Sequence, residues 1–194
     1  MIEFVEYSAQ ESVLPTDSEK IIAYHDKDNV VVYQAYKAEI AIYAIKHQHL
    51  GGTGFSLDRM SWIKPNFLWM MYRSGWATKA NQERILAIYI KKSTFEKIIS
   101  IGVPSSFDKC QETREIWLER LKKSDVVIQW DPDHDPSGKK HPSRRVIQLG
   151  LRGDTLKSFS KEWIVKIEDI TEFVISQRNK ENPLVPKESV YKTC

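Results

Sequence analysis

The sequence predicts an α+β fold: one domain with a mixed, mostly antiparallel sheet of about five strands and several flanking helices. A chain of 194 residues has the size of one domain, and its 41% hydrophobic and 28% charged content is typical of globular proteins. Its β-branched or aromatic runs are separated by helical stretches of unequal length. A regular βαβ winding requires more even gaps, so a doubly wound sheet is not expected.

The strands are predicted from short apolar runs rich in β-branched and aromatic residues. The first run is Val30–Tyr36, and the Asp28-Asn29 pair before it signals a turn. The other runs cover residues 84–90, 125–130, 145–150 and 163–167. These runs supply the strands of the predicted sheet.

Helices are predicted where apolar residues recur at a spacing of three or four. Residues 37–46 follow this pattern, with Ile40, Tyr43 and Ala44 on one face. Ser93 and Glu96 have the spacing of a capping box, which predicts a short helix over residues 93–99. Further helices are expected over residues 65–72, 112–122 and 169–177. In the helix over 112–122, the apolar positions are Ile116, Leu118 and Leu121.

The two ends of the chain are expected to be irregular around a domain over residues 20–178. Leu14-Pro15-Thr16 interrupts any helix within residues 1–19, and Pro183 and Pro186 do the same within residues 179–194. The first residues lack the basic and apolar regions of a secretory signal, and no apolar run is long enough to span a membrane. We therefore expect a cytoplasmic protein without a membrane partner.

The two cysteines, Cys110 and Cys194, lack the spacing of a metal site. Cys194 is expected to be a frayed, reduced thiol rather than half of a disulfide. No metal ion is therefore predicted from the cysteines.

Charge is unevenly distributed along the chain. Residues 1–29 contain seven acidic and two basic residues, whereas the remainder contains 27 basic and 19 acidic residues. A basic body can attract an anionic partner such as a nucleotide or a nucleic acid. An ordinary solvated surface is the alternative interpretation.

The stretch from Arg59 to Trp76 has the mixed composition of a ligand pocket. It holds Trp62, Trp69 and Trp76, which are half of the six tryptophans, together with basic side chains. Aromatic walls with a few polar groups are typical of small-molecule sites. These tryptophans are seven residues apart, and tryptophans at helical spacing also occur in ordinary protein cores. That alternative stays open.

Three cations in this stretch are candidate anion contacts: Arg59, Lys64 and Arg73. Pro65 disfavours helix at Lys64 and suits a first helical position, so the predicted helix places Lys64 at its positive N-terminal end. Gly75 is the expected stop. We expect the cations to hold phosphates, and Tyr36 or a tryptophan such as Trp62 or Trp69 to stack on a ring. The alternative is that the cations lie over tryptophan faces with their charges in water.

Polar residues inside two predicted strands are further candidates. Gln34 and Tyr36 lie in the first strand, and Gln148 lies in the apolar run Val-Ile-Gln-Leu. A glutamine inside a strand requires a hydrogen-bond partner, which is either structural or a ligand. Arg144 and Arg145 open the same strand, and alternation places them on opposite faces. Arg145 is a candidate phosphate contact.

The run Trp130-Asp-Pro-Asp-His-Asp135 is predicted to be a polar loop. Asp131, Asp133 and Asp135 could bind a divalent cation, but the spacing is not that of an EF-hand and an Asx-turn explains it equally well. His134 is a candidate general base or phosphate contact. A surface loop histidine is the alternative.

Three segments carry a resemblance to a known family: Met60–Ala77, Gln129–Asp135 and Arg144–Arg152. In these segments the chain resembles DUF4291, a family without an assigned activity. The resemblance covers most of residues 20–176. Standard signatures for phosphate-binding loops, dinucleotide-binding folds, zinc proteases and serine hydrolases are absent.

The order of elements over Val30–Tyr36, residues 37–46 and residues 51–63 is also similar to that of ADP-ribosyltransferases. This resemblance implies NAD as cofactor and transfer through an oxocarbenium-like state. Gln34 or Tyr36 would serve in the first strand and Gln148 in the fourth, where the family carries a glutamate. Arg59 would act on the phosphates, and His134 or Gln148 would orient the acceptor. A non-catalytic nucleic-acid-binding module, with a basic surface and exposed aromatic residues, is the alternative function, and a domain with a purely structural tryptophan core is a third.

Overall fold

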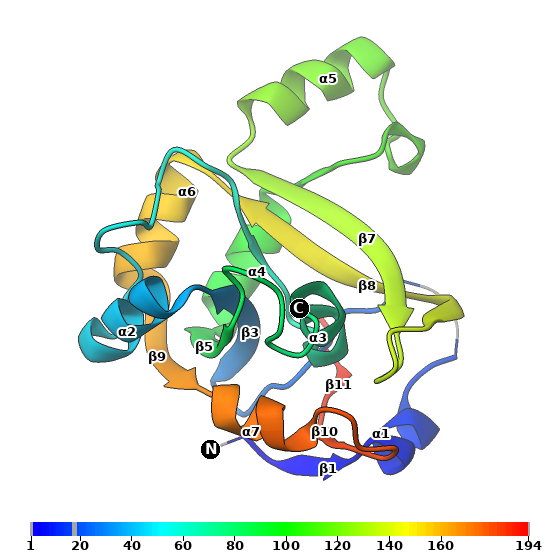
Figure 1. Cartoon of the computed structure of the whole chain (residues 1–194). Coiled ribbons are helices and arrows are strands. Elements are labelled where there is room, and N and C mark those ends of the chain that lie inside the picture. The colour runs from blue at the N-terminus through cyan, green and yellow to red at the C-terminus, as the bar shows by residue number, and fades with distance from the viewer. Residues whose placement is uncertain (1, 17–18, 194) are drawn as a thin grey trace.

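Two sheets carry the centre of the fold in the computed structural model, which describes residues 2–16 and 19–193 (Figure 1). One sheet is antiparallel, in the order β3 (Asn29–Tyr36), β5 (Arg84–Lys91) and β9 (Ile164–Asp169). The other has the order β4 (Ser61–Ile63), β8 (Lys140–Leu151), β7 (Val126–His134) and β6 (Val103–Pro104), in which only the β6–β7 pairing is parallel. The predicted α+β single domain with mostly antiparallel strands is confirmed.

The two sheets meet where β3 passes the end of β4. The backbone N–H of Tyr33 donates to the carbonyl of Lys64 at 2.7 Å, and the N–H of Lys64 donates back to Tyr33 at 3.3 Å. This reciprocal pair places Lys64 at the seam between the sheets.

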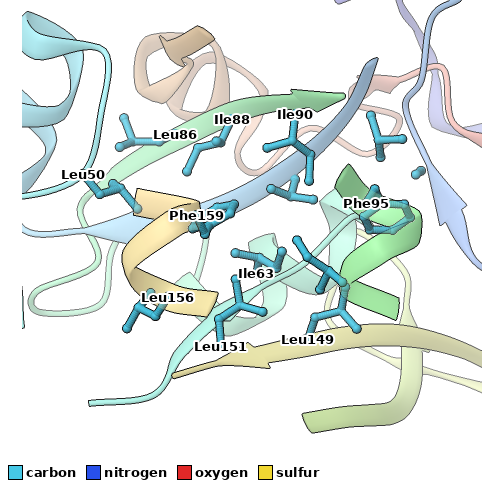
Figure 2. Close-up of a cluster of buried hydrophobic side chains, with 14 of the residues drawn as sticks. Leu50, Ile63, Leu86, Ile88, Ile90, Phe95, Leu149, Leu151, Leu156 and Phe159 are labelled. Carbon is cyan, nitrogen blue, oxygen red and sulfur yellow. The ribbon is translucent and has the colours of Figure 1, made fainter. Parts of the chain in front are cut away.

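The main core fills the space between the two sheets. Alternation along each strand sends Leu86, Ile88 and Ile90 of β5 into this space, opposite Leu149 and Leu151 of β8 (Figure 2). Each of these side chains is fully buried. Burial of one Leu or Ile contributes roughly 1.5–3 kcal/mol, so the facing rows hold the sheets together.

Helices flank the sheets and connect their strands. α2 and α4 lie at the positions predicted for helices, and α7 closes the domain. Their bounds, with those of the remaining helices, are α2 Ala38–His47, α3 Phe67–Ser74, α4 Lys92–Ser100, α5 Arg114–Lys123, α6 Gly153–Ser158 and α7 Thr171–Gln177, with short 3₁₀ and π turns at Phe107–Lys109 and Phe159–Trp163. The prediction of a capping box at Ser93 is wrong, because α4 begins at Lys92 and no side chain caps its N-terminus.

α5 projects away from the rest of the molecule (Figure 1). It was expected to bury Ile116 and Leu118, but these side chains are 49% and 50% exposed, and Trp117 is the buried one. The indole of Trp117 donates to the carbonyl of Pro104 at 2.9 Å. Trp117 is the one buried side chain of α5, so this single aromatic residue makes the main contact between the projecting helix and the rest of the protein.

The polar run after Trp130 is strand rather than loop. β7 continues to His134, with a register shift between Pro132 and His134. The turn to β8 follows, where the Asp135 side chain accepts from the N–H groups of Ser137 and Lys139. Cross-strand pairing with the long β8 therefore extends β7 beyond its apolar part.

The chain ends are more regular than expected. β1 (Phe4–Glu6) pairs with β10 (Leu184–Pro186), β2 (Ile22–Ala23) pairs with β11 (Ser189–Val190), and α1 spans Tyr7–Val13. The prediction of irregular ends is wrong because each short segment finds its pairing partner at the opposite end of the chain. The expectation for Cys194 lies outside the described residues. Across residues 2–16 and 19–193, no helix combines the length and apolar character needed to cross a membrane.

Candidate ligand-binding site

A cavity of about 420 Å³ opens beside the seam between the two sheets. Two indoles, Trp62 and Trp69, contribute to its walls. Two cations, Lys64 and Arg73, also line it. The carboxamides in the lining belong to Gln34, Gln82, Gln129 and Gln148. Among the described residues that line the cavity, none is acidic. The volume lies within the range of small-molecule sites.

β3 supplies two polar residues by simple alternation. Val30 and Val32 belong to the main core, and Gln34 and Tyr36 continue the same face of the strand toward the cavity. The Gln34 carboxamide Nε2 donates to Ser61 Oγ at 2.7 Å and to the Trp62 carbonyl at 3.2 Å. The side chain that the sequence placed inside an apolar strand thus connects β3 to β4.

β7 and β8 supply a pair of facing glutamines. Gln129 and Gln148 are direct cross-strand partners. Both donate through Nε2 to the carboxylate of Asp131, at 2.9 Å and 2.6 Å respectively. The indole N–H of Trp69 donates to the same carboxylate at 3.2 Å. Asp131 therefore fixes three side chains that line the cavity without lining it itself.

Sequence reasoning missed both Gln129 and the role of Asp131. The turn residues Pro136-Ser137-Gly138 between two strand patterns were the available signal. A hairpin centred there, traced outward without interruption, would pair Gln129 with Arg145. The irregularity between Pro132 and His134 shifts the register by three residues, and only this shift brings Gln129 opposite Gln148.

Lys64 is a buried cation without an ion-pair partner. Its side chain is 5% exposed, and within the described chain no carboxylate oxygen lies within 4 Å of its ammonium group. The ammonium makes a long 3.5 Å hydrogen bond to the Trp62 carbonyl and lies 5.7 Å from the centre of the Trp69 ring. Desolvation, followed by the charge of Arg73, lowers the pKa of Lys64 from 10.5 to about 8. The charge of Asp131 acts in the opposite direction and offsets only part of this shift, so the ammonium lies at the wall of the cavity without a carboxylate in contact with it among the described residues.

Arg73 and Trp62 complete the opening and one wall. Arg73 is exposed in the last turn of α3, where a cation favours the helix dipole. Trp62 pairs with Gly150 of β8, and a Cβ at position 150 would stand 3.0 Å from the indole and 2.5 Å from Met60 Sδ. Glycine at this position allows the Trp62 ring to lie against the sheet.

The N-terminus of α3 is not an anion site for a ligand, contrary to expectation. The helix begins at Phe67 rather than Pro65, because Asn66 is the N-cap and accepts from the Trp69 N–H at 2.7 Å. The Phe67 N–H donates to Glu188 at 2.7 Å. A carboxyl group from the C-terminal segment therefore occupies the position that a phosphate was expected to fill. The predicted stop is confirmed, since Gly75 has φ +59° at the C-cap.

Three of the predicted site residues lie elsewhere. Arg59 is exposed in the loop before β4 and does not line the cavity. His134 is buried, with its ring stacked on Tyr72 at 3.6 Å between centroids, and desolvation lowers its pKa. Arg145 lines a second cavity of about 260 Å³ that also contains the Lys109–Glu19 ion pair. The other seven, Gln34, Tyr36, Trp62, Lys64, Trp69, Arg73 and Gln148, share the larger cavity.

The match to a known family includes the three segments in which the sequence carries a family resemblance. A family model described as a domain of unknown function (DUF4291) matches residues 20–191. The chain belongs to the DUF4291 family. None of the curated proteins matches it in sequence. The matched region contains all the residues that line the cavity and Glu188, which accepts from the first N–H of α3.

The three aspartates of the DUF4291 chain do not converge on a cation. Asp131 accepts from the two glutamines, Asp133 pairs with Arg144 at 2.6 Å, and Asp135 holds the β7–β8 turn. The described residues contain no cluster of three or more His, Cys, Asp or Glu side chains suited to a metal ion. Each carboxylate instead neutralises or orients a neighbouring protein group.

The six tryptophans are buried or half-buried. Trp76, the third indole of the initial stretch, packs against Phe67 and donates to the Pro136 carbonyl at 3.1 Å. It supports α3 rather than the cavity. Rings in such positions are less available for stacking on a nucleic acid than the exposed aromatic residues expected for that function.

Proposed function

We propose that this DUF4291 protein binds an anionic nucleotide in the cavity beside the seam, with the phosphates at Lys64 and Arg73. The observation that carries the proposal is the charge of the lining: two cations and, among the described lining residues, no acid. A buried ammonium without a counter-ion is costly, and an anionic ligand would remove that cost. Trp62 and Trp69 offer flat faces to a ring.

The same proposal extends to NAD and to transfer of its ADP-ribose, through the resemblance to ADP-ribosyltransferases. The support for this extension is that Gln34, Tyr36 and Gln148, taken from strands of two different sheets, line one cavity. Such a transfer develops positive charge on the ribose. Since the described lining is cationic, phosphate binding is the part of the proposal with the stronger support.

Ligand binding is tested by isothermal titration calorimetry and thermal shift with NAD and ADP. We expect both to raise the melting temperature of the wild type. Lys64→Met should weaken binding by about tenfold, because it removes one charge-assisted contact. Release of nicotinamide from NAD is the separate assay for transfer.

Lys97→Met is the matched control. Lys97 is an exposed lysine on α4 whose ammonium also lies over an indole, 5.1 Å from the centre of the Trp163 ring, outside the cavity. It should bind nucleotide as the wild type does. A folded wild type that binds none of the nucleotides overturns the proposal, and so does equal weakening by both substitutions.

A further inference from the structure

The glutamines of the cavity share a constraint: the protein itself uses the nitrogen end of three of their carboxamides. Gln129 and Gln148 both donate to Asp131, and Gln34 donates to the Trp62 carbonyl and Ser61. An ionised carboxylate and a backbone carbonyl only accept hydrogen bonds. The atoms facing them must therefore be the NH₂ groups, whichever way the amides are drawn.

The consequence is that the carbonyl oxygens of Gln129 and Gln148, which line the cavity, are left without a donor from the protein among the described contacts. The Oε1 of Gln34 also has no hydrogen-bond partner among the described atoms, but it is buried behind the cavity wall. An acceptor that loses its water without gaining a donor costs roughly 1–3 kcal/mol. A ligand donor at the pair of Gln129 and Gln148 would satisfy these oxygens.

We propose that this wall of acceptors selects nucleotides whose ring carries an NH₂ donor, an amine or a carboxamide, over rings with a carbonyl at the same position. The inference rests on the proposed function, because it names the class of nucleotide that enters the same cavity. An adenine or cytosine amine donates to a glutamine oxygen, as does a nicotinamide carboxamide. Hypoxanthine and uracil place an oxygen there, and two acceptors then face each other without a proton between them.

Asp131 is the positioning residue in this arrangement. It holds two of the three carboxamides in the same orientation. In Asp131→Asn, one carboxylate oxygen becomes an NH₂ group of nearly the same size. The glutamine facing that group must turn its oxygen toward position 131 and its NH₂ toward the cavity. The substitution thus replaces one acceptor of the wall with a donor and leaves the shape nearly unchanged.

The test compares nucleotide pairs that differ in the exocyclic group and in the proton on the ring nitrogen beside it: ADP against IDP, and CDP against UDP, by titration calorimetry. In the wild type, at least one amino nucleotide should bind about tenfold more tightly than its oxo counterpart, since a matched hydrogen-bonding pair discriminates by about that factor or more. In Asp131→Asn the ratio should fall severalfold, because one acceptor of the wall has become a donor. A purely structural role for Asp131 would weaken both members of a pair equally.

A second variant covers the case in which Asp131→Asn does not fold. Gln129→Met/Gln148→Met removes two acceptors, keeps the side-chain length and leaves Asp131 with the Trp69 indole. Its preference for the amino nucleotide should drop severalfold. The control is Gln10→Met/Gln177→Met, which changes two buried glutamines outside this cavity and should keep the wild-type ratio.

The possible results distinguish a failure of the acceptor-wall inference from a failure of nucleotide binding itself. Equal affinity for the members of both pairs in the wild type overturns the acceptor-wall inference and leaves nucleotide binding standing. An unchanged ratio in a folded Gln129→Met/Gln148→Met variant overturns it as well. Absence of binding by all four nucleotides overturns both proposals.

Discussion

Replacing Lys64 with methionine should make the unliganded protein more stable. Methionine keeps most of the side-chain length of this residue, which is 5% exposed, and removes an ammonium group that has no ion-pair partner within the described chain. Desolvation, followed by the charge of Arg73, lowers the pKa of Lys64 from 10.5 to about 8. A difference of one in pKa corresponds to about 1.4 kcal/mol, so keeping the charged form in the folded protein costs about 3 kcal/mol.

This cost depends on pH in a defined way. Both the folded and the unfolded chain are protonated at Lys64 below pH 8, where the full cost is present. Between about pH 8 and 10.5 the unfolded chain binds more protons, so the stability of the wild type rises with pH. The stability gained by Lys64→Met should therefore be about 3 kcal/mol at pH 7, about 2 at pH 9 and about 1 at pH 10.

Urea unfolding at these three pH values measures the effect, with Lys97→Met as the exposed-lysine control. At pH 7 the melting temperature of Lys64→Met should rise by about 6–12 °C, since 1 kcal/mol corresponds to about 2–4 °C in a protein of this size. The reasoning is refuted when Lys64→Met is no more stable than the wild type at pH 7. A gap that stays constant up to pH 10 would also refute it, because the gain would then come from packing rather than from charge.

Three further predictions concern a buried carboxyl group, a buried ion pair and a glycine that lies against Trp62. Burial raises the pKa of Glu188 well above 4.5, so the contribution of this group to stability is complete below pH 4.5 and is lost as the pH rises toward the folded pKa. The stability of Glu188→Gln, measured by unfolding between pH 4.5 and 7, should lack that dependence on pH. Parallel pH dependence in the variant and the wild type would contradict the prediction. Arg144→Met should lower the free energy of unfolding by about 3–5 kcal/mol, because it leaves Asp133 buried without its partner. In denaturant titrations, the double variant Asp133→Asn/Arg144→Met should recover part of this loss. Additive effects of the two substitutions would exclude the coupling. Gly150→Ala should displace the Trp62 indole, shift tryptophan fluorescence and weaken nucleotide binding, and an unchanged spectrum with full affinity would show that the ring does not depend on the glycine.

The secondary structure was predicted best where local pattern and burial agree. The runs that became β3 and β5 are apolar and β-branched, so their strands followed from composition alone. Periodicity located α2, and glycine chemistry located the end of α3 at Gly75. The prediction failed for β1 and β10, because short segments become strands only through a partner far away in the chain.

In the candidate site, residue types were predictive, whereas the directions of the side chains were not. Residue type alone identified Lys64 and the indoles, since cations beside tryptophans are unusual in a core. Arg59 and His134 had equally suggestive chemistry, yet one side chain is exposed and the other is stacked against Tyr72. Local sequence does not encode which direction a side chain takes once the sheets are assembled.

By itself, the sequence determined the α+β class, the main strands and the mixture of charge and indole that marks the cavity, because these depend on residue types and short-range spacing. Only the tertiary structure decided that Glu188 accepts from the first N–H of α3, that Asp131 holds two glutamines, and that no carboxylate pairs with Lys64 within the described chain. The contacts of Glu188 and Gln148 join residues far apart in the sequence, and Gln129 lies beside Gln148 only through cross-strand register. Hydrogen bonds and charges act through space, so their partners become known only when the sheets have been brought together.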